Sequence, residues 1–300
     1  MYVVSPNIGG PIALYPSSVS GTAAPTAAVT GTYLNLPGYV TADSAGTFYV
    51  SDQETVYAYA KGTTSPARTI TSTSLTGEVR GMTTDASHNL YVAGGVFAGG
   101  VTTYGVAVFA PNAGTNATPL ETFTSTSLAF PYGVAVDAAG NIYVASDNQS
   151  GGYNAVLEFA KGAIGVATPT RMISGAATGL GQGELAGIAL DPSANIYCTV
   201  LADAYNPTDH IVEFAASTAS GNQPFTRELT GAATGLHGPT TLAIYGGNLF
   251  VGNASTMGPS QLFDVTVYPT SANGNQAPLR SIFPDDSGLN LEGSEIAVGP

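Results

Sequence analysis

The stretch GVAVDAAGNIYVAS, residues 133–146, decides the fold. It contains two runs in which apolar residues alternate with other residues, and a short segment with Asp, Gly and Asn separates them. Alternation with a period of two predicts β-strands, and the segment between them favours a tight turn. Asp137 can accept hydrogen bonds from turn amides, and Gly or Asn can adopt positive φ. The stretch therefore predicts a β-hairpin.

Similar hairpins recur along the chain and are followed by two further strand-like runs. The hairpins read YVTADSAGTFYVSD (39–52), GMTTDASHNLYVAG (81–94), GIALDPSANIYCTV (187–200) and TLAIYGGNLFVGN (241–253). The third run has the form VLEFAKG (156–162), and the fourth has the form TPTRMISG (168–175). Each unit thus holds four short strands, A to D, and the unit recurs six times. The turn residues are Asp43, Asp85, Asp137 and Asp191.

The register of the repeat predicts that the units form a closed ring. The last A strand, SEIAVGP (294–300), has no B strand after it, and MYVVSPN (1–7) supplies one. B-strand aromatics recur about once per 50 residues, and counting from Phe250 through the C-terminus to Tyr2 gives 52. A ring also removes the exposed ends of a linear array. We therefore expect an all-β, six-bladed β-propeller, a single domain over residues 1–300, closed by pairing 1–7 with 294–300.

The predicted outer strands carry a repeated charge. Arginines lie on four of the six D strands, where they would discourage pairing between molecules. Two blades also place a glutamate on strand C opposite the arginine, and cross-strand pairs of this kind stabilise a sheet. A structural role at the outer edge is therefore expected, with an anion-binding belt as the alternative. The residues are Arg68, Arg171, Arg227 and Arg280, with Glu158 and Glu213 as partners.

The Gly-x-Ala-x-Asp-x-x-Gly-Asn-x-Tyr-Val run resembles the NHL repeat, and the chain is more loosely similar to the six-bladed gluconolactonase-like hydrolases. In those hydrolases a divalent metal is held in the central channel by residues just before the innermost strands. The corresponding residues here include no carboxylate or amide: Gly38, Arg80, Tyr132, Ala186, Thr240 and Ser294. A metal at this ring is therefore not expected, because hard cations need several oxygen ligands.

Composition restricts the partners. The chain has 20 acidic and 7 basic residues among 300, a net charge of −13, which disfavours nucleic acid and anionic lipid. It has no apolar run of 18 residues, so we expect no membrane span. Low charge and abundant Ser and Thr favour an extracytoplasmic or secreted protein, although no signal peptide is recognisable at the N-terminus. Cys198 is a single cysteine and is expected in the core.

A binding surface is expected where the long D-to-A and B-to-C loops emerge, around the mouth of the channel. Arg80 and Tyr132 occupy the same repeat position in adjacent blades and would form a small-ligand clamp; Arg80 could instead neutralise nearby glutamates. The candidate ligand-binding residues are Arg80, Tyr132, Glu78, Glu184 and Glu295. A weaker candidate for a Ca²⁺ site, with an otherwise solvated acidic surface as the alternative, is formed by Asp285, Asp286 and Glu292.

The sequence leaves two functions open. The first is an extracytoplasmic recognition or scaffold module without cofactor, binding a small molecule, a glycan or a protein at the loop-rich face. The alternative is a hydrolase or lyase of the lactonase-like class, acting at the channel mouth. The absence of metal ligands from the predicted ring favours the first, and no catalytic residue can be assigned.

Overall fold

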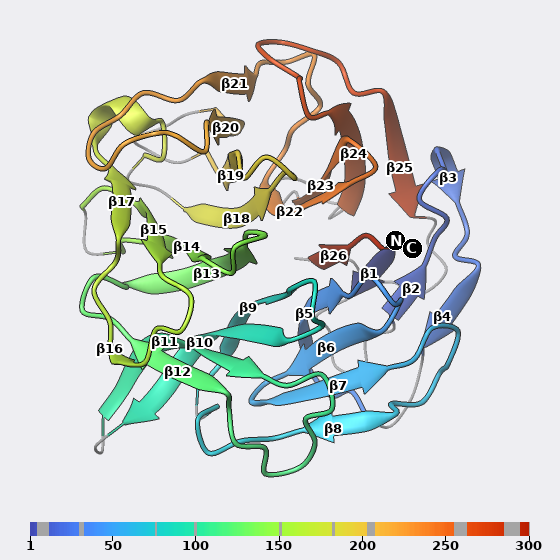
Figure 1. Cartoon of the computed structure of the whole chain (residues 1–300). Helices are drawn as coiled ribbons and strands as arrows, with labels where there is room; N and C mark the ends of the chain where they lie inside the picture. The colour runs from blue at the N-terminus through green and yellow to red at the C-terminus, as the bar shows by residue number, and fades with distance from the viewer. Residues whose placement is uncertain are drawn as a thin grey trace.

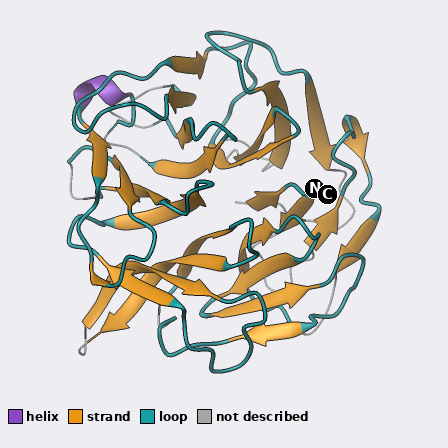
Figure 2. Cartoon of the chain, in the orientation of Figure 1, coloured by secondary structure: helices purple, strands orange, loops and turns teal. Residues whose placement is uncertain are grey.

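The computed structural model describes residues 1–4, 12–29, 33–75, 77–98, 101–149, 152–181, 184–202, 208–254, 263–284 and 295–299. Six sheets surround a central axis, with almost all regular structure in strands (Figures 1 and 2). Within these ranges the one helical element is the three-residue 3-10 helix η1 (Ala176–Thr178). No helix of the described chain has the length and apolar character needed to cross a membrane.

Each sheet contains four antiparallel strands in the order A to D, and we number the sheets as blades 1 to 6. Blade 1 consists of β5 (Pro37–Ala42), β6 (Phe48–Asp52), β7 (Thr55–Tyr59) and β8 (Arg68–Ile70). Blade 2 consists of β9 (Val79–Thr84), β10 (Leu90–Ala98), β11 (Val101–Phe109) and β12 (Glu121–Thr124). Blade 3 consists of β13 (Phe130–Val136), β14 (Ile142–Asp147), β15 (Ala155–Phe159) and β17 (Arg171–Ser174). Blade 4 consists of β18 (Leu185–Leu190), β19 (Ile196–Val200), β20 (His210–Phe214) and β21 (Arg227–Thr230). Blade 5 consists of β22 (Pro239–Tyr245), β23 (Asn248–Ala254), β24 (Phe263–Pro269) and β25 (Arg280–Pro284). Blade 6 consists of β26 (Glu295–Ala297), β1 (Tyr2–Val4), β2 (Ile12–Leu14) and β4 (Ala27–Val29). The predicted six-bladed propeller is confirmed.

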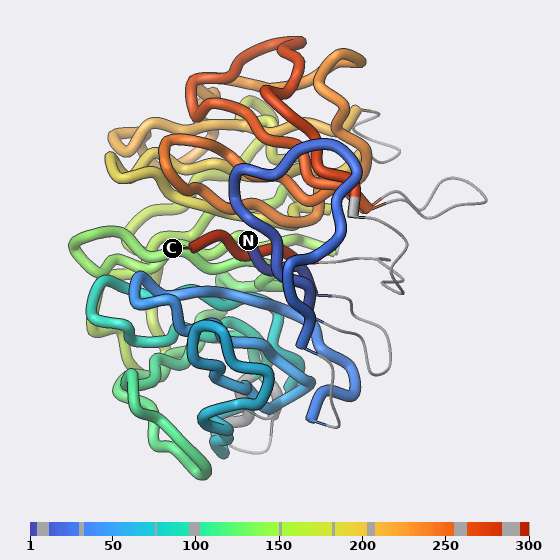
Figure 3. The backbone as a smooth tube through the Cα atoms, turned by 90° about the vertical axis from the view of Figure 1, so that its right-hand side faces the viewer, coloured from blue at the N-terminus to red at the C-terminus, as the bar shows by residue number. Residues whose placement is uncertain are grey.

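Blade 6 joins the two ends of the chain. Strand β1 pairs antiparallel with β26 on one side and with β2 on the other, with Val4 opposite Glu295 and Val3 opposite Ile296. The labelled ends lie beside each other in Figures 1 and 3. Tyr2 and Val3 are buried, and Val3 belongs to the same apolar cluster as Ile296. The predicted closure of the ring is therefore confirmed.

The A-to-B turns explain why the aspartates repeat. In blade 3, one oxygen of Asp137 accepts hydrogen bonds from the amides of Ala139 (2.9 Å) and Asn141 (2.8 Å). The other oxygen accepts from the Asn141 side chain at 2.9 Å. Gly140 has a φ of +90°, which a residue without a Cβ adopts without strain. These side chains close the hairpins, as predicted, and equivalent bonds occur at Asp43, Asp85 and Asp191.

The outer edges of the blades are covered by the chain itself. The loop between strands C and D of one blade runs along strand D of the preceding blade and bonds to it. Two of these loops form short parallel strands there: β16 (Gly165–Val166) on β12, and β3 (Gly21–Ala23) on β25. Single bridges join Ile173 to Gly221 and Leu229 to Gly274 in the same way. These contacts reduce the exposed edges that sequence reasoning left to charge alone.

The arginines of the outer strands reach into these covering loops. Arg171 binds Glu158 at 2.6 Å, as predicted, and also donates to the carbonyls of Ala216 and Thr218, both at 2.8 Å. Arg227 pairs with Glu213 at 2.5 Å in the next blade. Corresponding bonds run from Arg68 to Pro111 and Ala113, from Arg227 to Thr270 and from Arg280 to Ser17. The structural role expected for these arginines is confirmed, and the structure adds that they fasten one blade to the next.

The innermost strands contain an irregularity that positions the channel residues. In blades 1 to 5 the A–B pairing shifts by one residue near the start of strand A, so that strand A carries an extra residue there. In blades 2, 3 and 5 the extra residue is Arg80, Tyr132 and Thr240, respectively. A bulge of this kind leaves its residue out of the ladder and changes the direction of its side chain. The strands thus begin earlier than the sequence suggested, with the candidate residues inside them.

Candidate functional site

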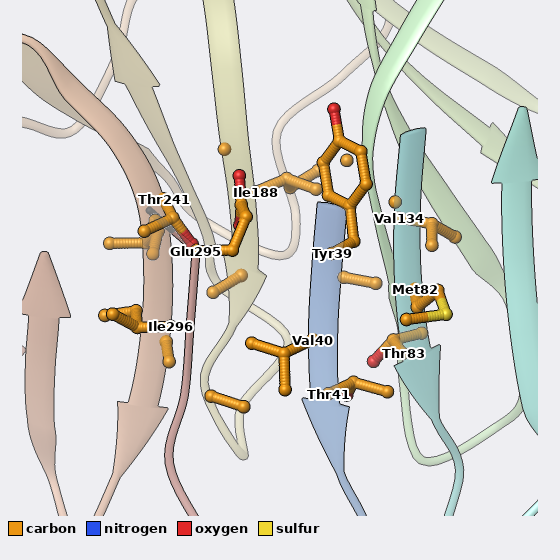
Figure 4. Close-up of a pocket in the computed structure, with 18 of the residues that line it drawn as sticks. Tyr39, Val40, Thr41, Met82, Thr83, Val134, Ile188, Thr241, Glu295 and Ile296 are labelled. Atoms are coloured by element: carbon orange, nitrogen blue, oxygen red, sulfur yellow. The ribbon is translucent and has the colours of Figure 1, made fainter. Parts of the chain in front are cut away.

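A cavity of about 300 Å³ runs through the centre of the ring. All six inner strands line it, namely β5, β9, β13, β18, β22 and β26, and its volume lies at the small end of the range typical of ligand sites. The strands contribute Val40, Met82, Val134, Ile188 and Ile296, and polar side chains lie among them (Figure 4). The space therefore suits a small molecule better than a folded partner.

The polar residues lie one position further along the strands than predicted. In the aligned repeat this position reads Tyr39, Gly81, Gly133, Gly187, Thr241 and Glu295. At Gly81, an added Cβ would lie 3.0 Å from Cα of Gly133, and at Gly133 it would lie 2.9 Å from Ile188. Three blades are thus packed too closely for a side chain at this position. The other three supply Tyr39, Thr241 and Glu295, and sequence reasoning missed Tyr39 and Thr241.

Glu295 is the carboxylate of the cavity. It is partly buried on β26, which pairs with β1 in its own blade and contacts the inner strands β22 and β5 of the two neighbouring blades, and the Thr241 hydroxyl donates a hydrogen bond to it. Burial raises the pKa of Glu295 from its ordinary value of 4.5 to about 8, and the hydrogen bond from Thr241 opposes only part of this rise. The reason is that the surrounding walls replace water that would otherwise stabilise the charge. At neutral pH this side chain is mainly an uncharged carboxylic acid.

Tyr39 lies beside Glu295 on the adjacent inner strand, and both side chains point toward the same end of the cavity (Figure 4). Burial raises the pKa of Tyr39, and the charge of Glu295 adds to this effect while Arg80 opposes it. The position of the backbone is fixed by a hydrogen bond from the Tyr39 amide to Oγ of Ser51, at 2.8 Å. Tyr39 therefore presents a neutral hydroxyl and an aromatic face to the cavity.

Arg80 and Tyr132 are neighbours, as the repeat predicts. The Arg80 guanidinium lies over the rings of Phe130 and Tyr132, with its carbon 5.2 Å and 5.4 Å from the two ring centres. It also forms an ion pair of 2.7 Å with Glu78, whose side chain is mostly exposed. The predicted alternative, Arg80 as a counter-ion for Glu78, is thus present together with the stacking. Arg80 borders the cavity, whereas Tyr132 lines it.

Glu184 is exposed and directly precedes β18. Burial raises the pKa of Tyr132, and the charges of Glu184 and Asp147 raise it further, which places both carboxylates near this ring. The Tyr132 hydroxyl accepts a hydrogen bond from Gln149 at 3.2 Å. The structure therefore brings the five candidate ligand-binding residues to one end of the channel. Asp285, Asp286 and Glu292, the Ca²⁺ candidates, lie outside the described residues.

The chemistry of this end of the channel is that of hydrogen bonding and aromatic contact. Within the described ranges no three His, Cys, Asp or Glu side chains are grouped as metal ligands. Glu295 is a single carboxyl group in the cavity wall, and Cys198, whose thiol pKa is raised by full burial, lies in the core rather than at the channel. The Thr240 hydroxyl is buried and has no hydrogen-bond partner among the described residues, whereas Tyr39 and Glu295 are partly exposed in the cavity lining. Donors and acceptors are therefore available to a polar ligand.

Comparisons with solved structures agree on the fold. A protein of unknown function from Bacteroides caccae aligns with a TM-score of 0.66 and 11% identity, over 99% of this chain and 97% of the other. A putative TolB from Agrobacterium tumefaciens aligns with a TM-score of 0.56 and 12% identity, over 86% of this chain and 84% of the other. The aldose sugar dehydrogenase from Streptomyces coelicolor, solved with bound PQQ, aligns with a TM-score of 0.54 and 11% identity, over 95% of this chain and 90% of the other.

Together the six sheets, the closure and these neighbours place the chain in the wide group of six-bladed β-propellers. No family model matches the sequence, and no curated protein is similar to it. At identities of 11–12% the structural likeness concerns the fold alone. The closer resemblance to NHL repeats stays a prediction from the motif.

Proposed function

We propose that this protein is a non-enzymatic recognition module that binds a small, polar, hydroxyl-rich ligand such as a sugar at the loop-side mouth of its channel, outside the cytoplasm. The observation that carries the proposal is the cavity of about 300 Å³, with Tyr39, Tyr132 and Glu295 in its wall. Aromatic rings contact the apolar faces of a sugar, and uncharged Glu295 can both donate and accept a hydrogen bond at neutral pH.

The state of Arg80 supports binding rather than scaffolding alone. Its guanidinium stacks on Phe130 and Tyr132 and uses one edge for Glu78, at 2.7 Å. A guanidinium has five N–H donors, so further donors remain for a ligand hydroxyl. The stacking keeps the flat group in place before a ligand arrives, which lowers the entropic cost of binding.

The test is ligand-observed NMR with a panel of monosaccharides and the polyol sorbitol, comparing the parent protein with Tyr132→Ala. We expect at least one compound to bind with millimolar or better affinity, and we expect at least a tenfold loss of affinity in Tyr132→Ala. Lys161→Ala, an exposed change on the outer part of blade 3, is the control and should bind as the parent does.

Melting temperatures show whether each variant is folded. If no compound of the panel binds, or if folded Tyr132→Ala binds as tightly as the parent, the mouth of the channel is not the recognition site. The hydrolase or lyase alternative would gain support if the bound compound were turned over in the same samples.

A further inference from the structure

The channel contains a carboxyl group, that of Glu295, and the described residues that line the cavity with it include no Lys, Arg or His. Arg80 and Glu295 both influence the pKa of Tyr39, and Arg80 is already paired with Glu78 at 2.7 Å. Beyond that neutral pair, Asp147 and Glu184 lie close enough to Tyr132 to influence its pKa, so the mouth carries an excess of negative charge. The whole chain carries a net charge of −13. A mouth of this charge concentrates small cations from solution.

The neighbours that the structure gives Glu295 are an aromatic ring, a hydroxyl group and an apolar residue. Tyr39 faces it from β5, the Thr241 hydroxyl bonds to it from β22, and Val4 lies opposite it on β1. The rings of Tyr132 and Phe130 already hold the Arg80 guanidinium at this mouth. Aromatic faces attract cations, and a carboxylate in a cavity of low dielectric attracts them more strongly than one in water.

We infer that the cavity recognises a ligand carrying a primary ammonium group, which forms an ion pair with Glu295 between Tyr39 and Thr241. The inference rests on the proposed function and adds the chemical class of the ligand: a hydroxyl-rich chain or ring bearing an ammonium group. A bare divalent cation is a poorer fit, because Glu295 offers one carboxylate where such an ion needs several oxygen ligands.

The protonation of Glu295 provides a specific signature. Its pKa of about 8 means that the group is mostly protonated at pH 7. An entering ammonium group stabilises the carboxylate, so binding at pH 7 releases a proton from Glu295 to the buffer. The affinity for the ammonium ligand should therefore rise between pH 6 and pH 8.5, whereas the affinity for an uncharged analogue should not.

The experiment compares glucamine with sorbitol, two chains of equal length that differ by an ammonium group in place of one hydroxyl. Isothermal titration calorimetry at pH 7 in phosphate and in Tris gives both the affinity and the number of protons released. We expect glucamine to bind the parent protein at least tenfold more tightly than sorbitol, with release of nearly one proton. In Glu295→Gln, glucamine should lose this advantage over sorbitol and should release no proton.

The outcomes separate the two proposals. If sorbitol and glucamine bind the parent equally and Tyr132→Ala weakens both, the ammonium inference is wrong and the proposed recognition function stands. If neither compound binds, both are wrong for this class of ligand. If Glu295→Gln does not fold, the pH profile of the parent decides: an affinity for glucamine that is constant from pH 6 to 8.5 overturns the inference. Displacement of glucamine by millimolar CaCl₂ would show an inorganic cation site instead.

Discussion

At the outer rim, four of the six blades carry an arginine at the same position of strand D and use it in the same way. At the channel mouth, one position near the start of strand A holds glycine in three neighbouring blades. In the other three blades it holds Tyr39, Thr241 and Glu295. The rim contacts recur because each blade meets its neighbour through the same geometry, and the bonds of Arg171 and Arg227 show this. The mouth departs from the repeat although the strands that build it are equivalent.

This difference separates stability from recognition. A charged group that is paired within its own blade, as Arg171 is with Glu158 at 2.6 Å, is accounted for by the fold. Glu295 is not accounted for in that way, because its burial works against its charged form. A polar group that costs stability where the repeat does not require it is a candidate for function.

The largest effect is expected from opening the ring, which both regions depend on. Removal of residues 1–4 deletes β1 and leaves β26 without its partner. Tyr2, Val3 and Val4 are all buried, and each large apolar side chain contributes about 1.5–3 kcal/mol. The total approaches the stability of a typical domain, about 5–15 kcal/mol. We expect loss of cooperative thermal unfolding, measured by circular dichroism; a melt identical to that of the parent would contradict the closure.

The second prediction concerns the mouth and follows the pH dependence of Glu295. Its pKa is about 8 in the folded protein against an ordinary value of 4.5, so only the unfolded chain ionises as pH rises between these values. The stabilising contribution of Glu295 to the free energy of unfolding is fully present below pH 4.5 and is lost as the pH rises through 8.

Glu295→Gln should lack this loss, because glutamine does not ionise. Urea unfolding of both proteins should be measured from pH 4 to 9. The free energy of unfolding of the variant, relative to that of the parent, should increase across this window by on the order of 3–5 kcal/mol, at about 1.4 kcal/mol per pKa unit. Other acidic groups are common to both proteins and cancel in the difference. Parallel stability curves would mean that Glu295 is hydrated and carries its charge at neutral pH.

The smallest effect is expected at the rim. Arg171→Ala removes the partner of Glu158 and two bonds to the next blade, and it should lower the free energy of unfolding by about 2–3 kcal/mol. Arg171→Lys keeps the charge but not the forked geometry, so it should recover part of this loss. Lys161→Ala, an exposed control, should change stability by less than about 0.5 kcal/mol. Altered ligand affinity in Arg171→Ala would break the proposed separation between rim and mouth.

The sequence predicted those features that repeat. The hairpin pattern of residues 133–146 determined the strands, the spacing of aromatics such as Tyr2 and Phe250 predicted the closure, and alternation placed Glu158 opposite Arg171. Each of these is a local pairing or a periodic signal, and both can be counted along a chain. The bonds from Arg171 to residues 45 and 47 positions later could also have been expected, since one blade covers about this length.

The details of the mouth could not be read in this way. The bulges insert one residue into strand A, so Tyr132 lies within the strand instead of before it. A one-residue shift exchanges the two faces of a strand, and this is why Tyr39 of blade 1 was missed, whereas Glu295 was among the predicted ligand-binding residues. One repeat position could have identified them. It holds Gly81, Gly133 and Gly187 in three blades, and the residues that replace glycine there in the other blades are the polar residues of the cavity.

The covering loops also determine where the ring would come apart. Five of them tie the outer strand of one blade to the next blade, in a series from blade 1 to blade 6. At β4 of blade 6 the described residues show no hydrogen bond to the corresponding loop of blade 1, residues 60–67, and Ala27 takes the place of the arginine. Among the described residues this seam therefore lacks the hydrogen-bonded tie and is held by apolar packing, with Tyr2 stacked on Phe48 and Val29 of the outer strand in the same cluster. Under heat or mechanical load we expect the ring to open at this seam, and the opened molecule would be a crescent of six blades joined by five such ties.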